Sequence, residues 1–545
     1  MVLRADSCDV RAEQCPSYGF LLICNDCFLQ YHELLLTMQC VRRRALTRVT
    51  PQSLTASTTS FRSQRRFLSI EELNDQREGK ERVVVLGSGW AGFTLSRALD
   101  PKKYQIVVVS PRSYFVFTPL LAGTSVGTLE FRTTLEPVRS FRGRGVGAEY
   151  FQGWADKVDF EKKTLAVEES VEDPMPSRAL TPGPNEEKSM GQREGEEGME
   201  AKKGEVFEMG YDKLIISVGC YAQTFNTPGV KENAYFLKDV GDARRIRNRL
   251  LSCFEIAALP TTSVEIKRML LNFAVVGGGP TGIEWSAELY DMVYEDIKRL
   301  YPELVQYVKI TIYDVAPTVL SMFDKRLSDY AMKTFGRQGI DIKTSHHIQE
   351  LRSGVPEGKQ PPSGVKDGAS LYTLKIEEEG EIGCGMVVWS TGLMMNPFIE
   401  NALKGKVKQH EKSHGILTNE RLQVKDTADK PIRDVYALGD CAVLEGTSYP
   451  ATAQVASQKA YWLAKCLNKG DIEQKKFNYR DLGVMAYIGS QKAILQSGGG
   501  DISGRIAWMI WRGAYLTKTV SWRNKILIPI YWTINWFFGR DISRF

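Results

Sequence analysis

Two glycine-rich turns constrain this sequence more than any other feature. Residues 82–99 read RVVVLGSGWAGFTLSRAL and residues 272–288 read NFAVVGGGPTGIEWSAE, so each turn follows an apolar run and leads into a predicted helix. The glycines are Gly87, Gly89 and Gly92 in the first turn and Gly277, Gly279 and Gly282 in the second. In a dinucleotide-binding unit such glycines permit the tight turn, the approach of the pyrophosphate and close helix–strand packing, in that order.

Two such units imply two dinucleotide sites, and the simplest chemistry that needs two is electron transfer between a flavin and a nicotinamide. The 545 residues have room for two or three domains, and 43% hydrophobic with 25% charged residues is typical of a folded protein. The predicted fold class is α/β, with two Rossmann-like domains of the flavoprotein pyridine-nucleotide reductase type and a C-terminal amphipathic, membrane-associating region.

The basic residues gather near the N-terminus. Residues 38–70 hold seven Arg and no acid, and the whole chain has a net charge of +6. The excess positive charge therefore belongs mostly to this segment and not to the body of the protein, so no nucleic-acid partner is expected. An Arg-rich, Ser/Thr-rich, acid-free segment is typical of a mitochondrial transit peptide, with a disordered basic tail as the alternative. Residues 1–37 fit neither pattern, which suggests that Met38 is the true start.

Cysteine spacing gives no indication of a metal site. Cys24 and Cys27 form a C-x-x-C, but no second pair or suitable His spacing accompanies them, so no metal is expected. The cysteines of the body are isolated and are predicted to pack as small apolar residues. They are Cys220, Cys253, Cys384, Cys441 and Cys466.

The first unit continues with a predicted strand at 104–109. It is followed by Ser110, at a point where NAD-binding units commonly have an acid that holds a ribose, and the missing acid disfavours NAD at this site. Residues 113–136 offer amides and hydroxyls suited to lining an isoalloxazine, or form a structural loop. A polar insertion is predicted at about 168–208, before a strand that ends at Gly219.

The second unit carries two acids. Glu284 is predicted in the first helical turn, either near the nicotinamide or simply as a favourable acid at a helix N-terminus. A strand at 308–313 delivers Asp314, whose carboxylate can accept both ribose hydroxyls and repels the extra phosphate of NADPH, so NADH is the expected substrate. A further strand leads into Thr391 and Gly392.

A third informative stretch covers residues 434–460. A predicted strand at 435–438 ends near Asp440, an acid suited to the ribityl or pyrophosphate region of a flavin. The segment 450–465 looks helical, with Gln454 and Gln458 four residues apart on one face. An ordinary polar helix face is the alternative for these glutamines.

Five motifs in this order resemble the type II NADH:quinone oxidoreductases, or alternative NADH dehydrogenases. They are GSGWAG (87–92), SPRSYFVFTPLL (110–121), VVGGGPTGIE (275–284), YALGDCA (436–442) and AQVASQ (453–458), and the resemblance covers 82–545. It implies non-covalent FAD in the first unit, NADH in the second, hydride transfer to the flavin, and respiratory-chain reduction of ubiquinone without proton pumping. It also implies catalytic roles for Glu284, Gln454 and Gln458, the two glutamines at the quinone.

The resemblance assigns cofactor-binding residues position by position. Those expected at FAD are Gly87, Ser88, Gly89, Trp90, Gly92, Ser110, Arg112, Thr118, Gly219, Asp440, Ala453 and Gln454. Those expected at NADH are Gly277, Gly279, Pro280, Thr281, Gly282, Glu284, Asp314, Thr391 and Gly392. No segment fits the calcium-loop pattern found in some relatives, so calcium control is not expected.

Composition and the order of the motifs together divide the chain into predicted domains. These are a leader (1–70), an FAD-binding domain in two parts (81–271 and 396–480), an NADH-binding domain (272–395) and a membrane-associating domain (481–545).

The C-terminal region points independently to a membrane surface. Residues 503–539 hold five of the ten Trp, five basic residues and no acid, but the longest uncharged run is 14 residues, short of the roughly 20 needed to cross a bilayer. A peripheral, monotopic attachment is therefore predicted; a buried or dimer-interface helix is the alternative, and a homodimer is expected. The expected location is the inner mitochondrial membrane, on the matrix side because no apolar anchor lies between Ile70 and Arg82.

Three other functions would share part of this architecture. A flavin disulfide reductase needs a cysteine pair next to the flavin, and no cysteine lies between Gly92 and Gly219. A sulfide:quinone oxidoreductase needs reactive cysteines and has less use for a second intact nucleotide turn with Asp314. A nucleotide-sensing interaction protein would bind both cofactors but transfer electrons slowly.

Overall fold

The structure, a computed structural model, describes residues 69–141, 148–170, 204–359 and 371–543. The predicted leader 1–70, with Met38 and the pair Cys24 and Cys27, lies outside the described residues except for its last two positions. Most of the predicted insertion 168–208 also lies outside them.

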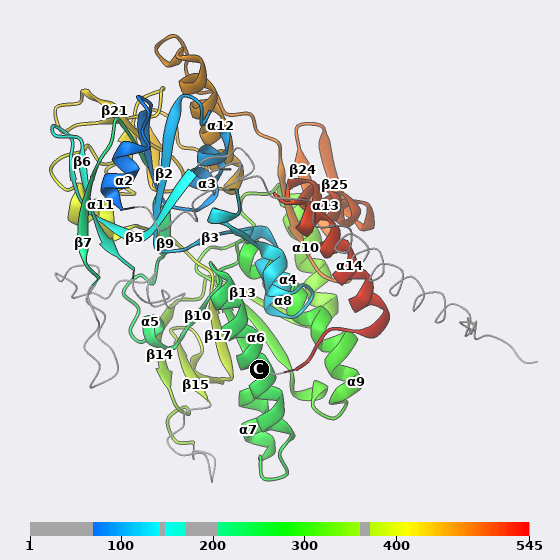
Figure 1. Cartoon of the computed structure of the whole chain (residues 1–545). Helices are drawn as coiled ribbons and strands as arrows, with labels where there is room; N and C mark the ends of the chain where they lie inside the picture. Colours follow the sequence, from blue (N-terminus) through cyan, green and yellow to red (C-terminus); the bar gives the residue numbers. More distant parts are fainter. Residues whose placement is uncertain (1–68, 142–147, 171–203, 360–370, 544–545) are drawn as a thin grey trace, which may run out of the picture. The chain divides into compact units, whose positions relative to one another are not determined.

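A ten-stranded sheet carries the first glycine turn (Figure 1). At its parallel centre β1 (Glu81–Leu86) lies between β2 (Tyr104–Ser110) and β8 (Lys213–Ile216), and β21 (Pro431–Ala437) pairs with β8. The outer strands are β5 (Ala148–Asp159), β6 (Thr164–Glu169) and β7 (Val206–Gly210) beyond β2, and β20 (Gln423–Lys425), β19 (Ile416–Thr418) and β22 (Ala442–Leu444) beyond β21.

Side chains of β1 alternate between two cores, as the period of a strand requires. Val83 and Val85 pack under α3 (Trp90–Ala98) and α12 (Ala453–Lys469), whereas Val84 and Leu86 face α2 (Ile70–Asp75) and α11 (Pro397–Ala402). Because helices cover both faces, the central strands are nearly continuous apolar runs.

Two sequence predictions differ from this sheet in their bounds. Strands β6 and β7 pair antiparallel, so 168–169 and 206–208 belong to the sheet and not to the predicted insertion. The two strand ends are short, partly polar and at the edge of the sheet. Their apolar periodicity is therefore too weak to distinguish them from the insertion. The helix predicted at 450–465 begins at Ala453, after the Thr452 cap, and runs to Lys469.

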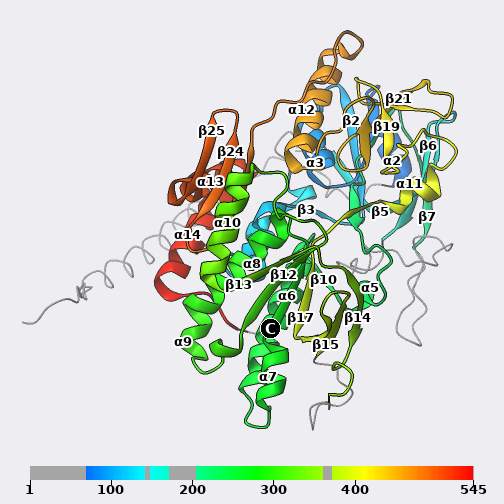
Figure 2. The same cartoon turned by 180° about the vertical axis from the view of Figure 1, so that it is seen from behind.

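A parallel five-stranded sheet carries the second glycine turn (Figure 2). In spatial order its strands are β10 (Tyr235–Phe236), β17 (Met386–Trp389), β11 (Asn272–Val276), β12 (Lys309–Asp314) and β13 (Ile340–Thr344). Strand β10 precedes the predicted domain boundary at residue 272 but joins this sheet, since a two-residue strand leaves no periodicity to read. The domain division otherwise stays a prediction.

The helices and small strands around the second sheet complete this part of the fold. The helices are α5 (Val230–Asn233), α6 (Val240–Ala258), α7 (Val264–Leu270), α8 (Pro280–Met292), a π-helix (Val293–Ile297), α9 (Lys298–Leu300) and α10 (Lys325–Gln338). A three-stranded antiparallel sheet consists of β14 (Ile348–Ser353), β15 (Tyr372–Ile376) and β16 (Gly380–Cys384). Two hairpin-like pairs are β3 (Tyr114–Val116) with β4 (Leu135–Pro137), and β9 (Cys220–Ala222) with β18 (Leu393–Met395).

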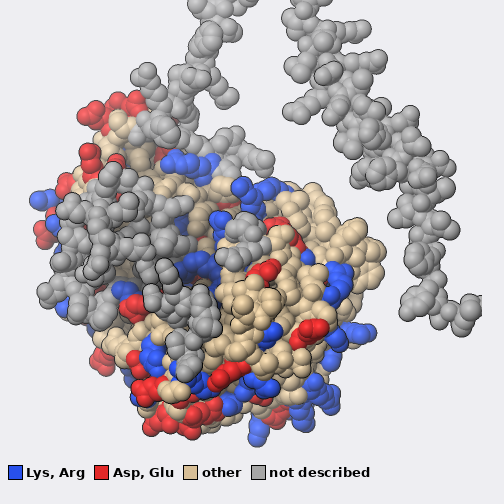
Figure 3. All heavy atoms as spheres, turned by 90° about the horizontal axis from the view of Figure 1, so that it is seen from below, with Lys and Arg blue, Asp and Glu red and all other residues tan. Residues whose placement is uncertain are grey.

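The C-terminal region packs on α8. It consists of the antiparallel strands β23 (Val484–Tyr487), β24 (Ala493–Ser497) and β25 (Gly500–Gly504), followed by α13 (Arg505–Lys518) and α14 (Trp522–Phe538). Trp511 and Ile528 are buried, but Trp522, Trp536 and Phe538 are among several large apolar side chains left exposed. Among the described residues, no helix is both long and apolar enough to cross a membrane. Figure 3 shows acidic and basic side chains interspersed over the face seen from below, beside an area where other residues predominate.

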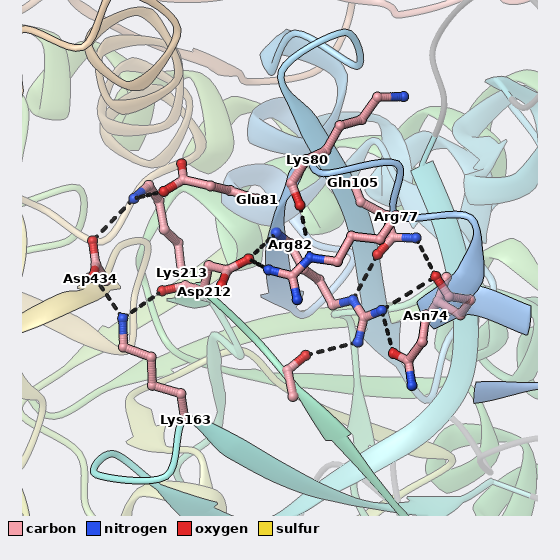
Figure 4. Close-up of polar contacts among 12 residues, drawn as sticks. Asn74, Arg77, Lys80, Glu81, Arg82, Gln105, Lys163, Asp212, Lys213 and Asp434 are labelled. Atoms are coloured by element: carbon pink, nitrogen blue, oxygen red, sulfur yellow. Dashed lines mark hydrogen bonds and ion pairs between the residues drawn. The ribbon is translucent and has the colours of Figure 1, made fainter. Parts of the chain in front are cut away.

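A polar cluster fastens α2 to the first sheet (Figure 4). The buried Arg82 guanidinium donates to Gln105 Oε1 at 2.8 Å and Asn74 Oδ1 at 2.7 Å, while its backbone N–H donates to Asp212. Arg77 also pairs with Asp212. The cluster lies where β1 and β8 begin, the edge opposite the glycine turn, so its role is structural.

Candidate functional site

The first glycine turn leaves room for a ligand at the N-terminus of α3. A Cβ added at Gly92 would lie 2.0 Å from the Gly87 carbonyl oxygen, so this glycine is required for strand–helix packing. Gly87 has φ +106°, and a Cβ there would lie 2.4 Å from the carbonyl oxygen of Ser217. At Gly89, in contrast, a Cβ would meet no protein atom within 4 Å. This open space in front of a helix N-terminus fits a pyrophosphate.

A cavity of about 360 Å³ extends from this turn, and most of the residues predicted for FAD line it. They are Gly87, Ser88, Gly89, Trp90, Ser110, Arg112, Thr118, Gly219, Asp440 and Ala453. Gly92 lies behind the turn, and Gln454 does not line the cavity. The residues present therefore fit a dinucleotide, although the binding role of each stays a prediction.

Two hydroxyl contacts shape the cavity walls. Ser110 occupies the position at which NAD sites have an acid. Its Oγ lies 3.0 Å from Ser88 Oγ, and both serines are buried. The Trp90 indole donates to Thr118 Oγ1 at 3.0 Å and thereby ties the turn to the segment after β3. These contacts support the prediction that residues 113–136 border the cavity.

Asp239 is a residue that sequence reasoning missed. It is 1% exposed, accepts from Arg112 Nη1 at 2.7 Å and from the Tyr114 hydroxyl at 3.0 Å, and caps α6. Burial lowers the pKa of Arg112, but the charge and hydrogen bond of Asp239 outweigh this and raise it overall. In the sequence, Asp239 and Asp242 look only like a capping box, because nothing local shows that Arg112 lies opposite.

Cys220 corrects one expectation. It does not pack as a small apolar residue but lines the cavity, where its thiol donates to Asp440 Oδ2 at 3.3 Å. Burial raises the pKa of Cys220 to about 12, so the thiol is protonated and a poor nucleophile at neutral pH. Cys253, Cys384, Cys441 and Cys466 are buried, as predicted.

The second glycine turn repeats the geometry of the first. A Cβ at Gly282 would lie 2.1 Å from the Gly277 carbonyl oxygen, whereas one at Gly279 would meet nothing within 4 Å. Pro280 occupies the first position of α8, where its missing N–H costs nothing. Thr281, next along, also lines the cavity of the first turn, so the two turns open toward one another.

Asp314 lies beside the second turn, at the end of β12. Its Oδ2 accepts from the Gly278 N–H at 2.5 Å and its Oδ1 from the Ala316 N–H at 2.7 Å. The carboxylate is thus held at the position where a ribose is recognised in dinucleotide folds. Thr391 and Gly392 follow β17, and Gly392 has φ +70°.

Replacing Asp314 by Ser is expected to relax the preference for NADH over NADPH. The substitution removes both the acceptor for the ribose hydroxyls and the charge that repels a 2′-phosphate. The measurement is the ratio of kcat/KM for the two nucleotides. An unchanged ratio with retained NADH oxidation would show that Asp314 does not read the ribose.

Glu284 lies deeper than predicted. It occupies the second turn of α8, since Pro280 is the first residue of the helix and no acid lies in its first turn. Its Oε1 accepts from the Tyr487 N–H at 3.0 Å and the Trp511 indole at 3.3 Å. Burial raises the pKa of Glu284 to about 8, although these two hydrogen bonds act to lower it. The C-terminal region that buries it could not be read from the α8 sequence.

Glu284 borders a second cavity, of about 550 Å³, between α4 (Leu121–Ser125), α8 and the C-terminal helices. Aromatic side chains form much of its wall. They are Tyr487, Trp508, Trp511, Trp532, Trp536 and Phe537. Acids from α8 form another part of the lining, so the cavity combines a flat apolar wall with titratable groups.

Gln454 and Gln458 lie on one face of α12, as predicted, but neither lines either cavity described above. Gln454 Oε1 accepts from the Tyr479 hydroxyl and, at 3.2 Å, from the Leu482 N–H. Gln458 exchanges two hydrogen bonds with the backbone of Arg480, at 2.8 and 3.0 Å. Both amides thus hold the segment that leads into the C-terminal region, and their catalytic role stays a prediction.

One group of described side chains has a spacing that could hold a metal. His347, Glu377 and Glu378 approach within 4.8 Å of one another on the surface of the second-sheet region. His347 Nδ1 already lies 2.7 Å from Glu378 Oε1. An exposed His–Glu ion pair accounts for this group, and the expectation of no metal stays a prediction.

Comparison with known families matches two segments of the chain. Residues 81–460 match the family described as pyridine nucleotide-disulphide oxidoreductase, and residues 482–541 match the NDH2 C-terminal domain. The second match coincides with strands β23–β25 and helices α13 and α14.

Several characterised or named proteins are similar over most of their length. A probable NADH dehydrogenase of Dictyostelium discoideum is 37% identical, over 86% of this chain and 93% of that protein. The external NADH-ubiquinone oxidoreductase 2, mitochondrial, of Saccharomyces cerevisiae is 35% identical, over 85% of this chain and 82% of that protein. The internal alternative NAD(P)H-ubiquinone oxidoreductase A1, mitochondrial, of Solanum tuberosum is 36% identical, over 85% of this chain and 88% of that protein.

A solved structure has the same fold. The structure of NDH2 from Plasmodium falciparum in complex with NADH superposes with a TM-score of 0.71, at 24% identity, and the match covers 85% of this chain and all of that one.

Proposed function

The chain belongs to the pyridine nucleotide-disulphide oxidoreductase family and, within it, to the type II NADH:quinone oxidoreductases, and from this premise we propose that it oxidises NADH and reduces ubiquinone by way of bound FAD. The observation that carries the proposal is the pair of glycine turns, each with open space at Gly89 or Gly279, and with Thr281 of the second turn in the cavity of the first. Two dinucleotides held at these turns would face the same cavity, as electron transfer between a flavin and a nicotinamide requires.

The residues form three regions, which would bind FAD, NADH and the quinone acceptor. The first cavity, with Arg112 and Asp440, would hold FAD, which when bound supplies a two-electron carrier between donor and acceptor. The second turn, with Asp314, would hold NADH. The second cavity suits a quinone ring because indole and phenyl groups wall it, and Glu284 offers a carboxyl group at its inner end.

The cysteines argue against the rival chemistries. A disulfide reductase or a sulfide:quinone oxidoreductase needs reactive cysteine pairs, and the described cysteines are all unpaired. Cys220, which lines the first cavity, holds its proton at neutral pH. Reduction of quinone without proton pumping is part of the proposal, as the resemblance to the type II enzymes implies.

The function is tested on the purified full chain. It should be yellow, bleach on addition of NADH without oxygen, and recover its colour rapidly on addition of a short-chain ubiquinone. A colourless protein would contradict FAD binding. A yellow protein that NADH bleaches but quinone does not restore would favour the nucleotide-sensing alternative.

We further propose that the C-terminal helices attach the protein to a membrane surface. Trp522, Ile526 and Phe538 on α14 are 78%, 59% and 76% exposed, and Lys518, Arg523 and Lys525 lie close to them in the chain. Aromatic and basic side chains of this kind favour the headgroup boundary.

Replacing Trp522, Ile526 and Phe538 together by Ser is expected to release the protein from vesicles. Burial of each side chain contributes about 1.5–3 kcal/mol, so the partition coefficient should fall about a hundredfold or more. Sedimentation with vesicles of zwitterionic and anionic lipid measures it. Phe225→Ser, at another exposed aromatic residue, is the control. Continued sedimentation of the triple variant would disprove the attachment.

The cellular setting completes the proposal. The relatives from yeast and potato are named mitochondrial, one external and one internal, so a mitochondrial location is supported and the membrane face is not. We propose the matrix side of the inner membrane, which protease protection in intact mitochondria tests. A homodimer is also proposed, and sedimentation equilibrium of the purified protein measures it.

A further inference from the structure

Four acids lie in a row along one side of α8 and the π-helix that follows. Glu284, Glu288, Asp291 and Glu295 are spaced by four, three and four residues, and all four line the second cavity. Residues with this spacing are neighbours on a helix surface, with Cβ atoms about 5–6 Å apart. Carboxyl groups on such side chains can exchange protons directly or through one water molecule.

Hydrogen bonds hold the inner three acids in place. Glu288 Oε2 accepts from the Thr128 hydroxyl at 2.6 Å. Asp291 accepts from the Tyr487 hydroxyl and, at 2.9 Å, from the Ser490 N–H. The backbone N–H of the same Tyr487 donates to Glu284, so one residue of β23 fixes both ends of this part of the row.

The outer end of the row reaches solvent. The Glu295 side chain is 53% exposed and pairs with Arg540 at 2.7 Å. Arg540 also lines the cavity, contacts Asp296 at 2.6 Å and donates to Thr128. Two adjacent acids of the π-helix, Glu295 and Asp296, thus contact the same guanidinium.

Burial favours the protonated form of the three inner acids. Burial raises the pKa of Glu284 to about 8 and of Asp291 to about 7, and also raises that of Glu288, against the charge of Arg540. The groups that face the row from other elements are Arg512 and Tyr515 of α13, Tyr487 of β23, Arg540, and Asp296 of the π-helix. Acids of this kind can both give and take a proton.

The proposed reaction needs a proton from solvent. NADH + H⁺ + quinone gives NAD⁺ + quinol: NADH delivers two electrons and one proton, and the second proton must come from water. We propose that Glu284, Glu288 and Asp291 carry this proton from water at Glu295 to a quinone oxygen in the second cavity. Each acid passes its proton inward and regains one from its outer neighbour. This inference rests on the proposed function.

The test separates proton delivery from electron transfer. Glu288→Gln and Asp291→Asn are compared with the parent chain in NADH bleaching, in ferricyanide reduction, which takes up no proton, and in turnover with a short-chain ubiquinone. Quinone turnover is expected to fall about tenfold to a hundredfold, with bleaching and ferricyanide reduction unchanged. In the parent, turnover should decline above about pH 8, as the fraction of protonated Glu284 falls; in the variants it should be slow throughout.

Two further measurements keep the proposal falsifiable. Glu303→Gln, at an exposed acid beyond α9, is the matched control and should behave as the parent does. Infrared titration of the parent chain, without substrates, should show protonated carboxyl bands that disappear between about pH 7 and about pH 8, with one fewer such band in Asp291→Asn. Equal losses in all three assays would assign the acids a structural role. Absence of a titrating band, or unchanged quinone turnover, would overturn the inference, whereas a parent that NADH bleaches without reducing quinone would contradict the proposed function itself.

Discussion

Gly89→Ala is expected to keep its fold but bind FAD about tenfold to a hundredfold more weakly. No protein atom lies within 4 Å of the added Cβ, and the backbone at Gly89 has φ −75°, which alanine adopts without strain. The methyl group instead occupies the space left for the pyrophosphate, and crowding of this kind costs about 1–3 kcal/mol. The measurement is the ratio of flavin to protein after purification, followed by titration with FAD.

Gly92→Ala, the matched variant in the same turn, should lose fold and cofactor together. Its Cβ would lie 2.0 Å from the Gly87 carbonyl oxygen and 2.7 Å from Ser217 Oγ, so α3 must move away from β1. Thermal unfolding followed by circular dichroism separates the two variants. If Gly89→Ala bound FAD as the parent does, the open space beside that glycine would not be the pyrophosphate site.

Asp239→Ala is expected to lower the free energy of unfolding by about 3–5 kcal/mol. The substitution leaves the Arg112 guanidinium without its partner at 2.7 Å and the Tyr114 hydroxyl without its acceptor, and it removes the N-cap of α6. Because Arg112 lines the first cavity, FAD affinity should fall as well.

Urea unfolding and FAD titration measure these two effects. Asp239→Asn is the control, since it keeps the shape and the cap but loses the charge, and it should show a smaller loss of stability. Equal, small effects of both variants would mean that water replaces the carboxylate and that the pair contributes little to the cavity.

The local patterns in the sequence determined the two nucleotide-binding units. Within each turn, Gly87 and Gly277 have positive φ, and a Cβ at Gly92 or Gly282 would meet the carbonyl oxygen of Gly87 or Gly277. The order of strand, turn and helix could therefore be read directly, and the order of the motifs identified the family. The position of Asp314 followed in the same way, because it depends only on where β12 ends.

Contacts between distant segments were decided by the tertiary structure alone. The sequence around Glu284 could not show that Tyr487 and Trp511, more than 200 residues later, bury its carboxyl group. Nor could it show that Gln454 and Gln458 hold the segment after α12. Glycine turns are dictated by sterics along the backbone, whereas the charge state and direction of a side chain depend on what packs against it, and for these residues that partner comes from another part of the chain.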